Sequence, residues 1–122
     1  MTLLEISFRI MAASAESVLT VHGCDDEERL VYVGGLDRER MDGITASLRA
    51  AGFEVREHHN PEMQGVHARN ICNRGRSGRG VQLEISAGLR RTMFKDFTRE
   101  GTQTTTSDFE AFVAAVRRAI MP

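Results

Sequence analysis

The sequence contains no tryptophan, and aromatic residues of all kinds make up only 6% of its 122 residues. Few side chains are therefore available to stack on unpaired bases, which argues against a protein that binds single-stranded nucleic acid. The formal net charge is −1, so the chain also lacks the overall positive field that draws proteins nonspecifically onto nucleic acid. Any affinity for anions must come from a local group of residues.

Cysteine is equally scarce, since Cys24 and Cys72 are the only two. Two thiols are too few for the disulfide framework of a small secreted protein, and these two lie too far apart for a CxxC zinc site. We expect buried, reduced thiols, with a bridge between them as the alternative.

Long apolar runs are absent as well. No stretch approaches the roughly 20 residues needed to span a bilayer. The apolar opening of the chain is interrupted by Glu5 and Arg9, which prevents a signal-peptide core from forming. The sequence therefore predicts no membrane association and synthesis in the cytoplasm, with cell lysis as a route of release.

The composition that is present is that of a globular chain, with 41% hydrophobic and 27% charged residues. Its length fits one compact domain over residues 1–122. Continuous apolar runs ending in glycine, typical of strands buried on both faces of a parallel sheet, occupy residues 17–23 and 30–35. An alternating pattern typical of a half-exposed strand occupies residues 53–56, and alternation also indicates a strand at residues 81–86. Weaker patterns indicate a strand at residues 3–8 and a helical turn at residues 11–16.

Helical spacing separates these predicted strands. Asp37 is a typical N-cap for a helix that should end before Gly52. Ser107 and Glu110 form a capping box at the start of a terminal helix, and residues 89–97 are amphipathic. The alternation of strands and helices predicts an α/β fold, a single-domain layered sheet with flanking helices.

His22 lies at the end of the first apolar run. In open α/β sheets the carboxyl ends of strands are where ligands tend to bind, and a neutral imidazole at that edge is a suitable zinc ligand. A single histidine with no known partners is more often structural, so both interpretations stay open. His58, His59 and His67 are expected at the surface.

The polar segment 69–80, within a predicted loop from Pro61 to Gly80, holds four arginines among glycines and asparagines. The planar guanidinium group of Arg74 matches a carboxylate or phosphate, the neighbouring amide of Asn73 can add an oriented donor, and glycines let main-chain N–H groups approach an anion. The segment predicts a local anion-binding site. A solvated surface loop with scattered salt bridges is the alternative.

Glu84 lies on the polar side of the predicted strand 81–86. If that side lines a cleft, the carboxylate could take a proton from a zinc-bound water and pass it to a leaving nitrogen. If it meets solvent, Glu84 is an ordinary strand glutamate, and alternation alone favours this second interpretation.

Three segments taken together closely resemble the phage-type poly-gamma-glutamate hydrolases. They are VLTVHGC at 18–24 with VYVGGLD at 31–37, NICNR at 70–74, and GVQLEISAGLR at 80–90. The likeness extends to about Phe94, and its order and spacing are more specific than any single motif.

This resemblance implies a zinc-carboxypeptidase-like α/β fold in which zinc activates water against the gamma-linked amide between glutamate units. By position, His22 is similar to the last zinc ligand, Asn73 and Arg74 to the carboxylate-binding pair, and Glu84 to the general acid/base. A polyanionic substrate such as poly-gamma-glutamate would also account for the arginine-rich segment.

The sequence departs from the family pattern at its beginning. Members have an earlier His-Gly-Gly element with a following glutamate, which supplies the other two protein ligands, and no comparable element precedes His22. The resemblance therefore predicts an incomplete zinc site. The chain would be a fragment, an inactive relative, or a protein completed by a complementing segment or a second copy. A noncatalytic module that holds anionic polymers through the Arg74 loop is the alternative function.

Overall fold

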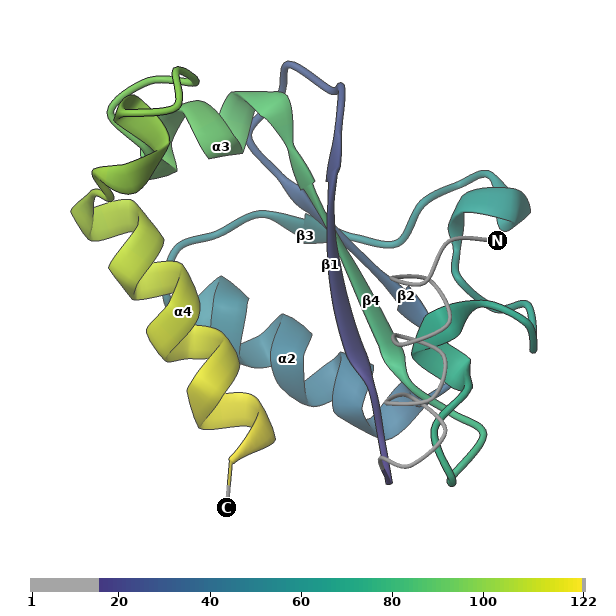
Figure 1. Ribbon diagram of the computed structural model, residues 1–122. Helices are drawn as coiled ribbons and strands as arrows, with labels where there is room; N and C mark the ends of the chain where they lie inside the picture. The colour runs from purple at the N-terminus through teal and green to yellow at the C-terminus, as the bar shows by residue number, and fades with distance from the viewer. Residues whose placement is uncertain (1–15, 122) are drawn as a thin grey trace.

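The computed structural model describes residues 16–121, which form one mixed sheet of four strands with flanking helices (Figure 1). The strands are β1 (Leu19–Cys24), β2 (Val31–Gly35), β3 (Val55–Arg56) and β4 (Val81–Ser86), and the helices are α2 (Arg38–Ala50), α3 (Ala87–Met93) and α4 (Ser107–Ile120). This confirms the predicted α/β layered sheet. The strand predicted at residues 3–8 lies outside the described residues, as does the turn predicted at residues 11–16 except for Glu16.

The strand order is β1-β4-β2-β3, with β1 parallel to β4, β4 antiparallel to β2, and β2 parallel to β3. The first apolar run was therefore wrongly predicted as a strand buried on both faces of a parallel sheet. It forms the edge strand β1, where Val21 is 55% exposed and His22 and Gly23 are also exposed. A continuous apolar run reports hydrophobicity but not the number of neighbours that a strand finds.

Strand β4 occupies an inner position instead, and all six of its residues are buried. The strand predicted at residues 81–86 is confirmed, whereas the interpretation that its polar side meets solvent, which alternation alone favoured for Glu84, was wrong. Its apolar side chains enter the hydrophobic core, while Gln82 lies beneath the long segment between β3 and β4 and Ser86 caps α3. Alternation cannot distinguish a polar layer covered by protein from one covered by water.

The two faces of the sheet differ in chemistry. Helices α2 and α4 lie on one side and the segment between β3 and β4 on the other (Figure 1). The helix-covered face is apolar, and burial of each of its large side chains contributes roughly 1.5–3 kcal/mol. Core residues include Val31, Val33, Leu83, Ile85, Met41, Ile44, Leu48, Phe112 and Val116.

Helix α2 begins and ends as predicted. The Asp37 carboxylate accepts a hydrogen bond from the main-chain N–H of Arg40 at 3.1 Å, which makes Asp37 the N-cap. Gly52 follows the helix with a φ of 93°, a conformation that other residues rarely adopt.

Helix α4 begins one residue away from the predicted cap. Thr106, not Ser107, is the N-cap, and its Oγ1 accepts from the N–H of Phe109 at 3.4 Å. Thr106 is also held from outside the helix, because its N–H donates to the carbonyl of Met93 at 3.0 Å and its hydroxyl donates to the carbonyl of Thr92. These contacts with the end of α3 fix which of two adjacent hydroxyl residues caps the helix. Among residues 16–121, no helix is long and apolar enough to cross a membrane.

Candidate active site

The sheet register places the predicted chemical residues on one face. His22 in β1 is opposite Glu84 in β4, and Glu84 is opposite Tyr32 in β2. Directly opposed residues of adjacent strands project from the same side of a sheet. His22, Glu84 and Tyr32 therefore form a row on the polar face, the face away from α2 and α4. We call this row and its neighbour, Thr20 with Gln82, the polar layer.

Glu84 is 8% exposed, which excludes the interpretation of a solvent-facing strand glutamate. Its Oε1 accepts a hydrogen bond from Nε2 of Gln82 at 3.1 Å. Its Oε2 is buried and has no hydrogen-bond partner among the described residues. A buried polar atom without a partner is costly and is found where a further group is expected to bind. The carboxylate is thus held by one oxygen, while the other has no hydrogen-bond partner among the described residues.

His22 lies beside Glu84 but on the exposed edge strand. Among residues 16–121, no group of three or more His, Cys, Asp or Glu side chains is arranged to hold a metal ion. His22 can offer one imidazole nitrogen, but these residues alone do not fit a catalytic zinc, which takes three protein ligands.

Asn73 is 3% exposed and joins three parts of the chain. Its Oδ1 accepts from the N–H groups of Leu36 at 3.2 Å and Gly80 at 3.0 Å. Its Nδ2 donates to the carbonyls of Gly65 at 2.6 Å and His67 at 3.1 Å. The amide is fully used by these main-chain contacts and fixes the segment against the start of β4. A role in substrate binding stays a prediction.

Arg74 follows the short 3-10 helix η2 (Ile71–Asn73) and is exposed. Within the described residues, its guanidinium group forms no salt bridge, and neither do those of Arg69 and Arg79, whereas Arg76 lies 3.6 Å from Glu16. The segment therefore presents cationic groups without internal partners beside the first residues of β4. Anion binding by this segment stays a prediction.

The structure adds residues that the sequence patterns did not single out. The hydroxyl of Tyr32 donates to Oδ2 of Asp26 at 2.7 Å, and this bond, with desolvation, raises the pKa of Tyr32 to about 12. The ring of His58 lies 4.6 Å from that of Tyr32. His58 is half-buried, while His59 and His67 are exposed as predicted. Only the strand register, which no local pattern reveals, brings Tyr32 to Glu84.

Both cysteines are free thiols, as predicted. Cys72 is buried, and desolvation raises its pKa to about 11. Cys24 is only half-buried, at the end of β1, and desolvation raises its pKa as well. A thiol whose pKa is raised is a poor nucleophile at neutral pH, so neither cysteine is a candidate for covalent catalysis.

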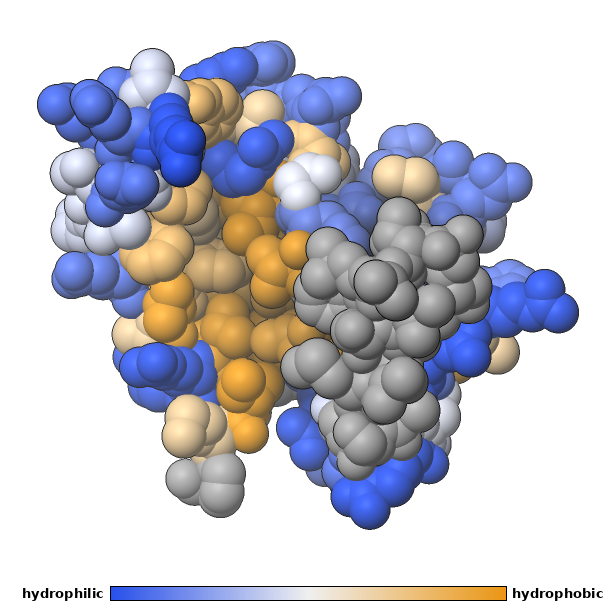
Figure 2. Space-filling view, viewed as in Figure 1, coloured by the Kyte–Doolittle hydropathy of each residue, from blue (hydrophilic) through white to orange (hydrophobic). Residues whose placement is uncertain are grey.

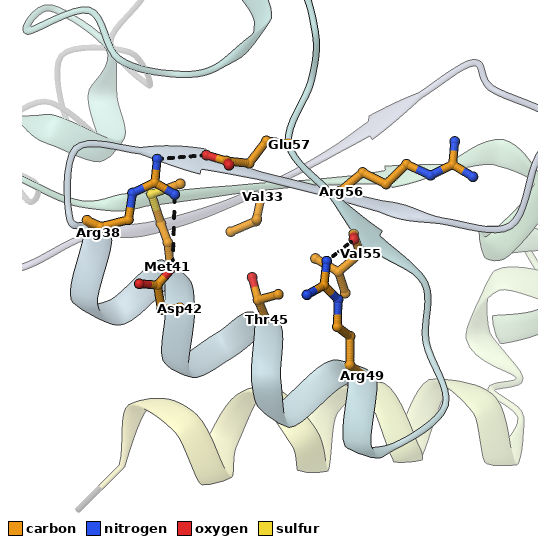
Figure 3. Close-up of a pocket in the computed structure, with 9 residues that line it drawn as sticks. All are labelled: Val33, Arg38, Met41, Asp42, Thr45, Arg49, Val55, Arg56 and Glu57. Carbon is orange, nitrogen blue, oxygen red and sulfur yellow. Dashed lines mark hydrogen bonds and ion pairs between the residues drawn. The ribbon is translucent and has the colours of Figure 1, made fainter.

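A separate shallow pocket lies between α2 and strands β2 and β3 (Figure 3). Its charges are largely satisfied within the pocket. Arg38 contacts Glu57 at 2.8 Å and Asp42 at 3.9 Å, and Arg49 donates to the carbonyl of Val55 at 2.9 Å. The polar layer, whose buried carboxylate oxygen lacks a hydrogen-bond partner among residues 16–121, is the stronger candidate for a functional site.

The chain is similar to three proteins of Bacillus subtilis (strain 168). It is 35% identical over 102 residues to the UPF0714 protein YmaC, and the aligned region covers 82% of this chain and 43% of YmaC. It is 38% identical over 89 residues to the SPbeta prophage-derived UPF0714 protein YoqZ, covering 70% of this chain and 32% of YoqZ. It is 31% identical over 99 residues to the UPF0714 protein YndL. The chain thus spans less than half the length of these relatives.

Two solved structures share its fold. The structure of a bacteriophage poly-gamma-glutamate hydrolase matches with a TM-score of 0.89 at 29% identity, over 94% of this chain and 56% of that one. A zinc-free apo structure of YndL matches with a TM-score of 0.85, also at 29% identity, over 93% of this chain and 57% of that one. The family model for poly-gamma-glutamate hydrolase matches residues 5–115, nearly the whole sequence. The chain belongs to the poly-gamma-glutamate hydrolase family.

Proposed function

We propose that this chain forms part of a zinc-dependent hydrolase that cleaves gamma-glutamyl amide bonds in poly-gamma-glutamate. The observation that carries the proposal is the adjacency of an exposed histidine, His22, and a buried carboxylate, Glu84, in a chain that belongs to this family. Histidine at the open edge can take part in metal binding, while the carboxylate beside it can move protons.

Glu84 acts as the general acid/base. Its Oε2, which has no hydrogen-bond partner among the described residues, accepts a proton from the attacking water and delivers it to the leaving nitrogen. Arg74 binds a substrate carboxylate through its planar guanidinium group, with Asn73 fixing the segment that carries it. Each glutamate unit of the polymer supplies such a carboxylate, so the substrate matches the excess of arginine in this segment.

His22 would hold zinc only together with ligands from outside residues 16–121. When bound, zinc supplies Lewis-acid activation of water and of the scissile carbonyl. The relatives are longer proteins, since the chain spans only 43% of YmaC and 56% of the bacteriophage hydrolase. A segment that corresponds to their additional length could supply the two further ligands.

The edge strand β1 is where a complementing segment would add. Val21 on this strand is 55% exposed, and hydrophobic surface gathers between α4 and the sheet edge (Figure 2). An unpaired strand edge beside apolar surface is a template for another strand. We propose that a segment with the missing ligands pairs with β1 next to His22; a second copy of this chain is the other candidate partner.

The test is to incubate the purified chain with zinc and poly-gamma-glutamate, with and without a polypeptide carrying the His-Gly-Gly element and its glutamate. Polymer mass is followed by size-exclusion chromatography. We expect mass to fall in the completed mixture, and Glu84→Gln to slow this by about 100-fold or more. Glu39→Gln is the matched control, because Glu39 is exposed on the first turn of α2. Polymer that keeps its mass in the completed mixture would contradict the proposal.

The second candidate function is a noncatalytic module that holds anionic polymers. The arginines of segment 69–80 without salt-bridge partners among the described residues favour it. In that case the same mixtures show retention of polymer without cleavage, zinc has no effect, and Arg74→Ala weakens retention while Glu84→Gln does not.

A further inference from the structure

We propose that Asn70 and Gln82 are positioning residues that orient Glu84 and leave its Oε2 as the oxygen that exchanges a proton with substrate. The inference rests on the proposed function of Glu84 as general acid/base. It goes further by naming the working oxygen and the two amides that select it.

The three side chains form a continuous chain of hydrogen bonds. The N–H of Cys72 donates to Oδ1 of Asn70 at 3.1 Å. Nδ2 of Asn70 donates to Oε1 of Gln82 at 3.0 Å. Nε2 of Gln82 donates to Oε1 of Glu84 at 3.1 Å. The chain thus runs from a main-chain N–H in η2 to the carboxylate in β4.

The direction of this chain is fixed at its beginning. A main-chain N–H can only donate, so the side-chain atom of Asn70 that meets it must be the oxygen. The amide nitrogen of Asn70 then faces Gln82, whose oxygen must accept, and the amide nitrogen of Gln82 in turn faces Glu84. Glu84 Oε1 therefore always meets a donor. A proton on the carboxyl group belongs on Oε2.

Burial keeps this arrangement in place. Gln82 is 7% exposed and Glu84 is 8% exposed, so water does not readily replace their mutual hydrogen bond. The main chain at Gly65 lies directly over Gln82, since a Cβ added to Gly65 would come within 3.3 Å of both Cβ and Cδ of Gln82. Gln82 is packed as well as hydrogen-bonded.

The free oxygen is not the only unsatisfied group in the polar layer. Oγ1 of Thr20, which lies opposite Gln82 on β1, is also buried without a partner among the described residues. Thr20 and Glu84 thus present two unpaired oxygens on the same face of neighbouring strands.

The decisive variant is Asn70→Asp. Aspartate keeps the oxygen that caps η2, so the turn should fold as before. It replaces the donor to Gln82 with an acceptor, so the Gln82 amide should rotate and turn its oxygen toward Glu84. We expect the side-chain amide resonances of Gln82 in ¹H–¹⁵N spectra of the full chain to shift, while the main-chain resonances of β4 stay dispersed. Unchanged Gln82 resonances would mean that Asn70 does not set the Gln82 amide, and that result would overturn the proposal.

A second variant changes the other end of the hydrogen-bond chain, at Glu84. Glu84→Gln should also shift the Gln82 side-chain resonances, and Glu39→Gln should not. If the Gln82 side-chain resonances do not shift in Glu84→Gln, the hydrogen bond between Gln82 and Glu84 is absent. The proposal then fails, whether or not Asn70→Asp folds. Neither measurement requires hydrolysis, so the two proposals can fail separately. If the proposed function alone fails, the resonances show the hydrogen-bond chain but the polymer keeps its mass.

A kinetic comparison applies in the completed, zinc-loaded mixture. We expect Asn70→Asp to lower kcat about tenfold with KM within about twofold of the original, because orientation of a proton carrier affects the transition state more than ground-state binding. A raised KM with unchanged kcat would assign Asn70 to substrate binding and overturn the positioning role.

Discussion

At the scale of single residues, the polar layer shows how hydrogen bonding sets chemical character. Tyr32 lies next to Glu84 in the register, yet its hydroxyl is directed to Asp26 at 2.7 Å. The hydrogen bond to the Asp26 carboxylate, together with desolvation, disfavours loss of the phenolic proton and raises the pKa of Tyr32 to about 12. Tyr32 therefore remains a neutral neighbour of the candidate acid/base over the whole physiological range.

Tyr32 is the only tyrosine and the chain has no tryptophan, so tyrosinate absorbance reports this one group. We expect a native titration midpoint near 12, a midpoint near 10 in urea, and a native midpoint closer to 10 in Asp26→Asn. Because the folded pKa is the higher one, the stabilising contribution of Tyr32 is complete below pH 10 and is lost as pH rises toward 12. Asp25→Asn is the control, and an Asp26→Asn midpoint equal to the original would refute the coupling.

At the scale of elements, tertiary contacts decide details that local propensity leaves open. Two adjacent hydroxyl residues, Thr106 and Ser107, can each cap α4. The contacts of Thr106 with Thr92 and Met93 place it at the cap. The cap therefore also fastens α4 to the end of α3, and α4 in turn covers the apolar face that lies behind the polar layer.

This assignment predicts unequal effects for two matched substitutions. Thr106→Ala should lower the free energy of unfolding by about 1–2 kcal/mol, since it removes a cap and a hydrogen bond to α3. Ser107→Ala should change it by less than about 0.5 kcal/mol. Urea denaturation followed by circular dichroism measures both. A larger loss for Ser107→Ala would mean that Ser107 is the cap in solution.

At the scale of the whole molecule, the open edge of the sheet connects the fold to the incomplete metal site. His22 lies on β1, and β1 pairs with only one other strand among the described residues. The same edge therefore has an exposed candidate ligand, and apolar surface gathers beside it (Figure 2). That residues 1–122 form one partial hydrolase domain, synthesised in the cytoplasm, stays a prediction.

Val21→Lys tests the role of this edge. Val21 is 55% exposed, so its replacement should change the stability of the chain little, but it should weaken association with the complementing polypeptide tenfold or more. Isothermal titration calorimetry measures the association. Val66→Lys is the matched control, because Val66 is 45% exposed and lies in the segment between β3 and β4. Equal binding by both variants would place the partner elsewhere.

Much of the candidate site could be predicted from the sequence, but its geometry could not. The order and spacing of the motifs around His22, Arg74 and Glu84 led to the family that the comparisons then showed. Asn70 and Gln82 lie within the same motifs. Gln82 is two residues from Glu84 in one strand, so both project from the same face, and this was the only local indication that Gln82 belongs to the site. Nothing local indicates that their amides meet.

The sequence by itself determined the alternation of strands and helices, the N-cap of α2 and the family, because these depend on periodicity, capping chemistry and motif order along the chain. Only the tertiary structure decided that β1 is an edge strand, that Glu84 is buried and that one of its oxygens lacks a partner. Those properties depend on which distant strands pair and in what register. Pairing is settled by the packing of the whole sheet, and the hydrophobicity of one segment does not reveal it.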